Sequence, residues 1–286
     1  MTTPATAAPR RHGIRARLGS LALPAFTGLL LLVLFSPIGV MIAFSFNDPA
    51  GRQNIVWQGF TLRNYVDVWG RSEITDAMTT SLAVAAISTI FATAFGTMIG
   101  LALTRHEFRG RWIMNLLIFI PMTAPEIILG ASLLTLWISF GVERGFLTIL
   151  VAHIMFNISF VVVTVRARLA GMNRSLEEAG MDLYADGRTT FWRITFPLIF
   201  PGVLSAALLA FALSIDDYVI TVFSSGRVET FPLWVYGASR LGIPPEVNVL
   251  GTLIFLVAMA FIAVQLWTQR RQGRSGQAAP VTLVGR

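Results

Sequence analysis

The sequence predicts an all-α integral membrane protein, and two observations lead to this fold class. Hydrophobic residues make up 55% of the 286-residue chain and charged residues 13%, whereas a typical soluble domain contains roughly 25% charged residues. The mean hydropathy is +0.68. The apolar residues also gather in long runs, and a helix of about 20 such residues crosses the hydrocarbon core of a bilayer. We expect six transmembrane helices, with a cytoplasmic helix-turn-helix element between the fourth and the fifth.

Six apolar runs define the expected helices in chain order. They cover residues 21–46, 79–104, 112–140, 146–165, 196–223 and 249–267. The first run is too long for the core of a signal peptide and no small-residue cleavage site follows it, so we expect a retained helix. The two ends of the chain, residues 1–20 and 268–286, are rich in small and polar residues and are expected to be flexible tails.

The arginines predict the orientation of these helices in the membrane. All 22 basic residues are Arg. Sixteen of them lie at the two ends of the chain and in the second and fourth connections, and six lie in the other connections. Connections rich in Arg remain in the cytoplasm, so we expect both termini and the fourth connection on the cytoplasmic side.

The composition excludes several classes of site. The chain has no Cys, so disulfides, thiolate metal ligands and thiol nucleophiles are excluded. Without Lys, it cannot form a phosphate-binding loop of the GxxxxGKS or GxxxxGKT type. The three His residues are far apart, and no Ser, His and Asp set with hydrolase context is present. We therefore expect no catalytic residue, metal site or cofactor in this chain.

The fourth connection, residues 175–197, is a charged stretch between two apolar runs and is called the hairpin segment below. Ser175 and Glu178 fit a capping box, which predicts that a helix begins with Ser175 as its N-cap. The apolar residues that follow recur with the spacing of one helical face. Asp186 is expected to cap a second helix, which Pro197 helps to end. The segment is therefore predicted to fold as helix, turn, helix.

Several residues of the hairpin segment are unfavourable in an isolated helix. Gly180 costs about 1 kcal/mol relative to Ala, and Glu178 with Asp182 is a like-charge pair four residues apart. The Gly leaves room for a partner protein to approach the helix closely, and unpaired acids attract Arg or Lys from such a partner. We therefore infer that the first helix of the hairpin segment lies in a groove of a cytoplasmic protein. The alternative is that Glu178 only closes the capping box.

The hairpin segment resembles the EAA motif of ATP-binding-cassette importer permeases. That motif reads E-A-A, three residues, G, nine residues, I-x-L-P, and its spacing is matched along the full length. Four positions agree with it: Glu178, Ala179, Ile194 and Pro197. Three positions depart from it: Gly180 replaces an Ala, Tyr184 replaces the Gly and Phe196 replaces the Leu. In the family that Gly lies at the turn of the coupling element, and Gly187 is a nearby source of flexibility.

Residues 75–267 resemble the type-1 transmembrane domain of these importers. The nearest resemblance is to the second permease subunit of spermidine/putrescine importers, through PMTAPE at 121–126, AFALSIDDYVIT at 210–221 and LGIPPEVN at 241–248. It implies a polyamine importer of the bacterial cytoplasmic membrane. Permeases for iron, thiamine, sulfate or phosphonate share this fold. Two alternatives of a different class are an ion-coupled secondary transporter and a non-transporting assembly or sensor protein.

The resemblance also implies partners and a role for the hairpin segment. The partners are a second permease, two cytoplasmic ATPase subunits that use ATP and Mg, and an extracytoplasmic binding protein. The hairpin segment would couple the permease to an ATPase subunit. The expected coupling residues are Glu177, Glu178, Ala179, Gly180, Asp182, Leu183, Tyr184, Asp186, Gly187, Ile194 and Pro197.

Three acids within or at the ends of apolar runs are candidates for the translocation path: Glu126, Asp216 and Asp217. A charge in the membrane interior costs ~2.5 to 3.5 kcal/mol, so it normally faces a cavity, a partner or the interface. Together with Tyr218, which is available for cation–π contact, the two Asp residues would favour a cationic substrate. The alternatives are that they cap a helix or pair with an outer Arg, and that Glu126 pairs with an Arg of the second permease.

Four residues are expected to serve helix packing. His153 and Asn157 lie four apart on one helix face and are expected to form hydrogen bonds between helices. Gly96 and Gly100 are expected to allow two helices to approach closely.

Overall fold

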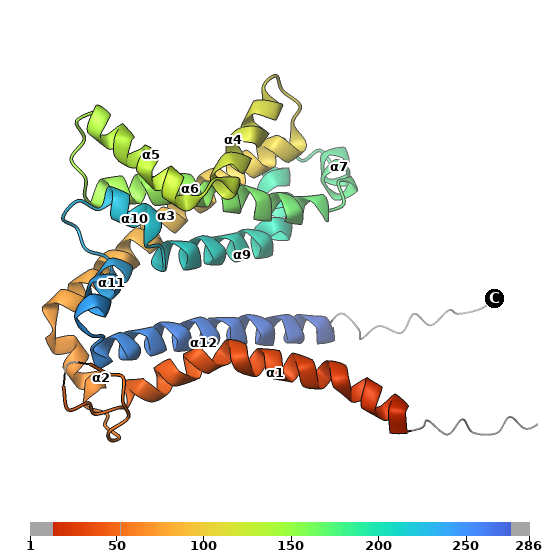
Figure 1. Ribbon diagram of the computed structural model, residues 1–286. Coiled ribbons are helices and arrows are strands. Elements are labelled where there is room, and N and C mark those ends of the chain that lie inside the picture. The colour runs from red at the N-terminus through yellow and green to blue at the C-terminus, as the bar shows by residue number, and fades with distance from the viewer. Residues whose placement is uncertain (1–13, 52, 276–286) are drawn as a thin grey trace, which may run out of the picture. The chain divides into compact units, whose positions relative to one another are not determined.

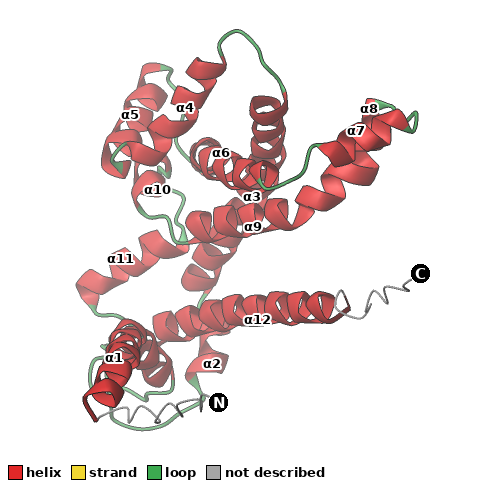
Figure 2. Ribbon diagram, turned by 90° about the vertical axis from the view of Figure 1, so that its right-hand side faces the viewer, coloured by secondary structure: helices red, strands yellow, loops and turns green. Residues whose placement is uncertain are grey.

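The computed structural model describes residues 14–51 and 53–275, which are mostly helical. Within these ranges, β pairing is limited to one isolated antiparallel bridge between Asn47 and Phe60. The chain divides into two compact units, Met1–Val68 with Gly242–Arg286, and Trp69–Leu241. Figures 1 and 2 show the helices of both units. The prediction of an all-helical fold is confirmed for the described residues.

The first unit is built on two long helices, α1 (Ile14–Ser45) and α12 (Pro245–Ser275), with the short α2 (Asn64–Asp67) beside α12. Figure 1 shows α1 and α12 side by side. Their approach depends on Gly251, because a Cβ there would lie 2.7 Å from the sulfur of Met41. Both helices extend into the segments expected as tails; the rest of each tail lies outside the described residues.

The second unit contains the remaining helices in chain order. They are α3 (Ser72–Arg105), α4 (Arg111–Thr123), α5 (Glu126–Ser139), α6 (Phe146–Ala170), α7 (Ser175–Asp182), α8 (Gly187–Thr190), the π-helical turn η2 (Phe191–Thr195), α9 (Phe196–Ile215), α10 (Val219–Ser224) and α11 (Phe231–Leu241). The 3₁₀ turn η1 (Val68–Gly70) precedes α3.

The core of the second unit lies where α3, α6 and α9 pack against one another. Its buried apolar residues are Ala92, Val161, Val165, Leu169, Ile199, Val203, Ala206 and Ala210. Gly96 allows α3 to approach α6, because a Cβ there would lie 2.6 Å from Val161 Cγ1. At Gly100 the corresponding distance to Val165 Cγ1 is 3.4 Å. The predicted close packing is confirmed, most clearly at Gly96.

Two of the six apolar runs are not single straight helices. The run at 112–140 divides into α4 and α5, which meet at an angle of 110°. The break is at Ala124, whose backbone is extended, as expected for a residue that precedes a proline. The run at 196–223 divides at Asp216 into α9 and α10. Hydropathy alone predicted neither break, because it does not report helix direction.

Within the described residues, four helices are long and apolar enough to cross a membrane: Leu23–Ser45, Ser72–Arg105, Phe146–Ala170 and Gly187–Ile215. The bent pair of α4 and α5 would add a fifth span, and Pro245–Ala260 is a shorter apolar helix. The large apolar side chains of α1 between Leu23 and Phe35 are exposed. Such a surface fits a lipid environment.

Candidate functional site

The hairpin segment forms the short helix α7 and the first turns of the long helix Gly187–Ile215, at one end of the second unit and remote from α5 (Figures 1 and 2). Helix α7 is followed by a turn, then by α8 and η2, which lead into α9. Most of the predicted coupling residues are exposed: Glu178, Ala179, Asp182, Leu183, Tyr184, Asp186, Gly187 and Pro197. Gly180 is buried, and Glu177 and Ile194 are partly buried. The exposed set includes two large apolar side chains, Leu183 and Tyr184, at the tip.

Tyr184 closes helix α7 in a left-handed conformation, with φ of +64°. Its N–H donates to the carbonyl of Met181, and the N–H of Ala185 donates to the carbonyl of Gly180. These two bonds form a Schellman motif, whose left-handed position is usually Gly. Gly187 has no positive φ of its own. The Tyr itself therefore makes the turn, at the position where the EAA motif has Gly, and its side chain is 99% exposed.

The predicted capping box at the start of α7 is wrong. The N-cap position is Arg174, whose backbone is helical and which makes no side-chain cap. Instead, the N–H of Ser175 donates to Asn173 Oδ1 at 3.1 Å, because an Asn side chain readily reaches an N–H two residues on. Glu178 lies 3.5 Å from Arg174 Nε, and both of these side chains are largely exposed.

The start of the second helix agrees with the prediction, but its predicted end at Pro197 is wrong, because the helix continues from Gly187 to Ile215. Asp186 Oδ1 accepts a hydrogen bond from the N–H of Thr189 at 3.0 Å and caps α8. Hydrogen bonds from the side chain and the backbone of Thr189 lower the pKa of the Asp186 carboxyl group below its ordinary value. The charged carboxylate is therefore the form that fits the cap.

Glu177, rather than its neighbour Glu178, ties the hairpin segment to the rest of the unit. Glu177 Oε2 lies 3.2 Å from Arg105 Nη2 at the end of α3, and these side chains are only 12% and 17% exposed. Glu177 Oε1 accepts a hydrogen bond from Thr195 Oγ1 at 2.7 Å. The sequence offered no signal for this difference, because the two Glu residues are adjacent and only tertiary packing brings Arg105 near one of them.

Gly180 serves packing inside the hairpin segment. A Cβ at this position would overlap Cδ1 of Ile194, a residue of η2, which packs against α7. The sequence interpretation assigned the close approach to an external protein. In the structure the two arms of the hairpin segment use it themselves.

Asp217 belongs to a buried polar cluster that joins α6, α9 and α10. Its Oδ2 lies 3.3 Å from His153 Nε2 and accepts hydrogen bonds from the N–H and Oγ1 of Thr221, both at 2.8 Å. His153 Nδ1 is 2.6 Å from Ser214 Oγ. The prediction that His153 bonds between helices is confirmed. Asn157 is 1% exposed, and its amide finds no hydrogen-bond partner in the part of the chain that the structure describes.

The other three translocation candidates lie apart from this cluster. Asp216 follows the last residue of α9 and is exposed. Tyr218 is partly buried and contacts Tyr236 of α11, with ring centroids 4.7 Å apart and ring planes tilted by 39°. Glu126 is exposed at the first residue of α5. Among the described residues no group of three or more His, Asp or Glu side chains could hold a metal ion.

Comparison with known proteins decides the family. Residues 92–272 match the family described as binding-protein-dependent transport system inner membrane component. The chain belongs to this family.

The relatives of this permease include two polyamine permeases of Escherichia coli. It is 36% identical to the spermidine/putrescine transport system permease protein PotC of Escherichia coli (strain K12), over 91% of this chain and 98% of that protein. It is also 36% identical to the putrescine transport system permease protein PotI of the same strain, over 82% and 85% of the two chains. The resemblance drawn from the EAA-like residues is thereby confirmed.

Solved structures share the fold of this permease. One is a bacterial ABC transporter involved in the import of the acidic polysaccharide alginate, with a TM-score of 0.56 and 21% identity over 94% of this chain and 99% of that chain. Another is the inward-facing MetNI methionine ABC transporter, with a TM-score of 0.56 and 18% identity over 69% of this chain and 93% of that chain. The family match and the 36% identity to PotC together show that the chain is a permease subunit of an ABC importer.

Proposed function

We propose that this permease forms half of the translocation path of an ATP-driven importer for polyamines such as spermidine or putrescine. The observation that carries the proposal is the 36% identity to PotC over 91% of this chain and 98% of that protein. A polyamine carries several positive charges, and this permease exposes acids at Glu126 and Asp216. Permeases for iron, thiamine or phosphonate share the fold and are the alternative substrates of the same kind of importer.

The proposed topology has six spans and both termini in the bacterial cytoplasm. Residues 21–46 form the first span, and residues 75–267 form the type-1 transmembrane domain, in which the bent pair α4 and α5 counts as one span. The connections rich in Arg then lie in the cytoplasm. Glu177 and Arg105, which are in contact, belong to the fourth and second connections, and these two connections lie on the same side in this topology.

The hairpin segment is proposed to dock on an ATPase subunit from the cytoplasm. Leu183 and Tyr184 expose apolar surface at its tip, and Glu178 exposes a carboxylate in the first turn of α7. A short helix with such a face fits a groove that offers apolar contacts and an Arg or Lys. The complete importer would contain two ATPase subunits, which bind ATP and Mg, a second permease and an extracytoplasmic binding protein.

The ion pair of Glu177 and Arg105 gives the docked segment a route to the membrane helices. A movement of the ATPase subunits would displace α7, and the ion pair would pass this displacement to α3, which is long enough to cross the membrane. In this proposal the coupling residues divide into two groups. Exposed residues contact the ATPase, and Glu177 with Gly180 and Ile194 holds the hairpin segment in place.

The translocation residues are proposed to divide in a similar way. Asp216 is exposed at the end of α9 and is the candidate for substrate contact, with Glu126 as a second acid. Asp217 accepts hydrogen bonds from the first turn of α10 and pairs with His153, so its proposed role is to position Asp216 and Tyr218.

The test is reconstitution of the complete importer in proteoliposomes with its own binding protein. We expect spermidine or putrescine bound to that protein to stimulate ATP hydrolysis and uptake. Stimulation by iron, thiamine or phosphonate but not by polyamines would contradict the proposed polyamine substrate. The assignment as an ATP-driven importer would still hold. Uptake driven by an ion gradient without ATP would instead favour a secondary transporter.

A further inference from the structure

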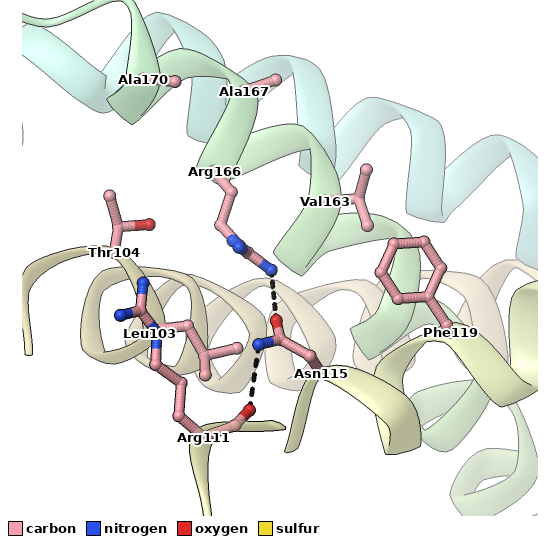
Figure 3. A pocket seen from close by; sticks show the side chains of 9 residues that line it. All are labelled: Leu103, Thr104, Arg111, Asn115, Phe119, Val163, Arg166, Ala167 and Ala170. Carbon is pink, nitrogen blue, oxygen red and sulfur yellow. Dashed lines mark hydrogen bonds between the residues drawn. The ribbon is translucent and has the colours of Figure 1, made fainter. Parts of the chain in front are cut away.

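A pocket of about 550 Å³ lies between the ends of α3 and α6 and the first turns of α4 (Figure 3). Arg111 and Arg166 supply its two charged side chains, and no Asp or Glu is among the nine residues that line it. Leu103, Phe119 and Val163 supply large apolar side chains. No residue of the hairpin segment or of the translocation candidates lines this pocket, so the proposed transport role leaves it unexplained.

The two guanidinium groups are arranged to receive an anion. Figure 3 shows the side chains of Arg111 and Arg166 extending from facing elements into the space that the lining residues enclose, with Arg166 turned toward Asn115. Arg166 Nη1 donates to Asn115 Oδ1 at 2.7 Å, and Asn115 Nδ2 donates to the carbonyl of Arg111 at 3.0 Å. Asn115 therefore holds one guanidinium through a single N–H and leaves its other N–H groups for a ligand.

Neither guanidinium is neutralised within the described part of the chain, where the salt bridges involve other residues. The neighbouring Arg105 differs, since Glu177 pairs with it. Two like charges that line one pocket repel each other unless an anion lies between them. Phosphate oxygens suit this position, because Arg binds them through two parallel N–H groups.

The position of the pocket restricts the kind of anion. Arg111 is the first residue of α4, and Arg166 is near the end of α6, while both α3 and α6 are long enough to cross the membrane. The pocket therefore lies where a membrane-spanning helix passes from hydrocarbon to headgroups. At this level a phosphate with an attached acyl chain can satisfy the arginines and cover Phe119 and Val163 together.

We propose that this pocket binds one anionic phospholipid, with its phosphate between Arg111 and Arg166 and an acyl chain against Phe119 and Val163. The exposed Ala167 and Ala170, which also line the pocket, leave it open to the bilayer. The inference depends on membrane insertion alone. It does not depend on polyamine transport, so the two can fail separately.

The test is native mass spectrometry of the purified importer complex, titrated with phosphatidylglycerol or with phosphatidylcholine. For the double variant Arg111→Gln with Arg166→Gln, we expect the affinity for phosphatidylglycerol to fall at least about tenfold, since each charged hydrogen bond contributes substantially. The matched control is Arg109→Gln, because Arg109 is exposed in the same connection and does not line the pocket. It should retain wild-type affinity.

A second variant keeps the test decisive if the double variant fails to fold. Ala167→Trp fills the pocket without removing a charge, and we expect it to lower phosphatidylglycerol binding while subunit assembly remains normal. Unchanged binding in both pocket variants would overturn the proposal. So would an equal loss in Arg109→Gln, equal affinity for phosphatidylcholine, or displacement of the lipid by inorganic phosphate at millimolar concentration.

Discussion

Glu177 and Arg105 form a largely buried ion pair that joins the hairpin segment to the end of α3. Thr195 adds a third contact, because its hydroxyl donates a hydrogen bond to the other carboxylate oxygen of Glu177. One carboxylate thus connects α7, η2 and α3. The neighbouring pair of Arg174 and Glu178 is exposed, and such surface pairs typically contribute only about 0 to 1 kcal/mol.

The first prediction concerns this ion pair. In Glu177→Gln the charge is lost while the shape is kept, and Arg105 is left largely buried without its counter-charge. We expect ATP hydrolysis stimulated by the binding protein to fall by about tenfold or more, equivalent to about 1.4 kcal/mol of coupling. The measurement is stimulated ATPase activity in proteoliposomes, with Thr195→Val as a milder variant that removes only the hydroxyl hydrogen bond to the carboxylate.

The charge exchange Glu177→Arg with Arg105→Glu is the control for the ion pair. Partial recovery of activity in the exchanged variant is expected if the attraction itself positions the hairpin segment. A variant Glu177→Gln with full stimulated activity would show that the pair has no part in coupling.

The second prediction concerns the exposed Glu178. Glu178→Arg should leave the chain inserted in the membrane but abolish stimulated ATP hydrolysis and uptake, because the reversed charge would repel an Arg or Lys of the ATPase groove. The measurement is co-purification of the ATPase subunits together with uptake. Arg174→Glu is the matched comparison on the same helix, and wild-type coupling in Glu178→Arg would contradict docking through this carboxylate.

The third prediction concerns the left-handed Tyr184. Tyr184→Gly removes the steric conflict of a side chain at positive φ and should stabilise the turn by about 1 kcal/mol. Tyr184→Ala keeps the conflict and removes the ring. The thermal midpoint of the purified complex should therefore rise in the Gly variant and not in the Ala variant.

Uptake by the same two variants tests a second role of the ring. If the exposed ring docks on the ATPase, both variants should lose stimulated activity to the same degree. Wild-type activity in both variants would limit Tyr184 to the geometry of the turn.

The fourth prediction separates two adjacent acids. Asp216→Asn removes an exposed charge and should lower the uptake of a polyamine about tenfold while assembly of the complex survives. Asp217→Asn should instead impair assembly, since its carboxylate accepts from Thr221 and pairs with His153. The measurements are uptake kinetics and the yield of intact complex, and unchanged kinetics in Asp216→Asn would leave that acid with no substrate role.

The sequence alone determined the membrane class, the helical content and the family. Hydropathy reports which residues avoid water, and the spacing from Glu178 to Pro197 reports a family pattern, so both can be read without coordinates. The cap at Asp186 was predictable for a similar reason, because a capping side chain reaches an N–H only three residues away.

Only the tertiary structure decided which acid of each adjacent pair is held inside the protein. Glu177 meets Arg105 across 72 positions of sequence, and Asp217 meets His153 across 64. The contact of Gly180 with Ile194 likewise depends on how the two arms of the hairpin segment pack against each other. Burial and long-range contact are properties of the packed chain, and local spacing carries no information about them.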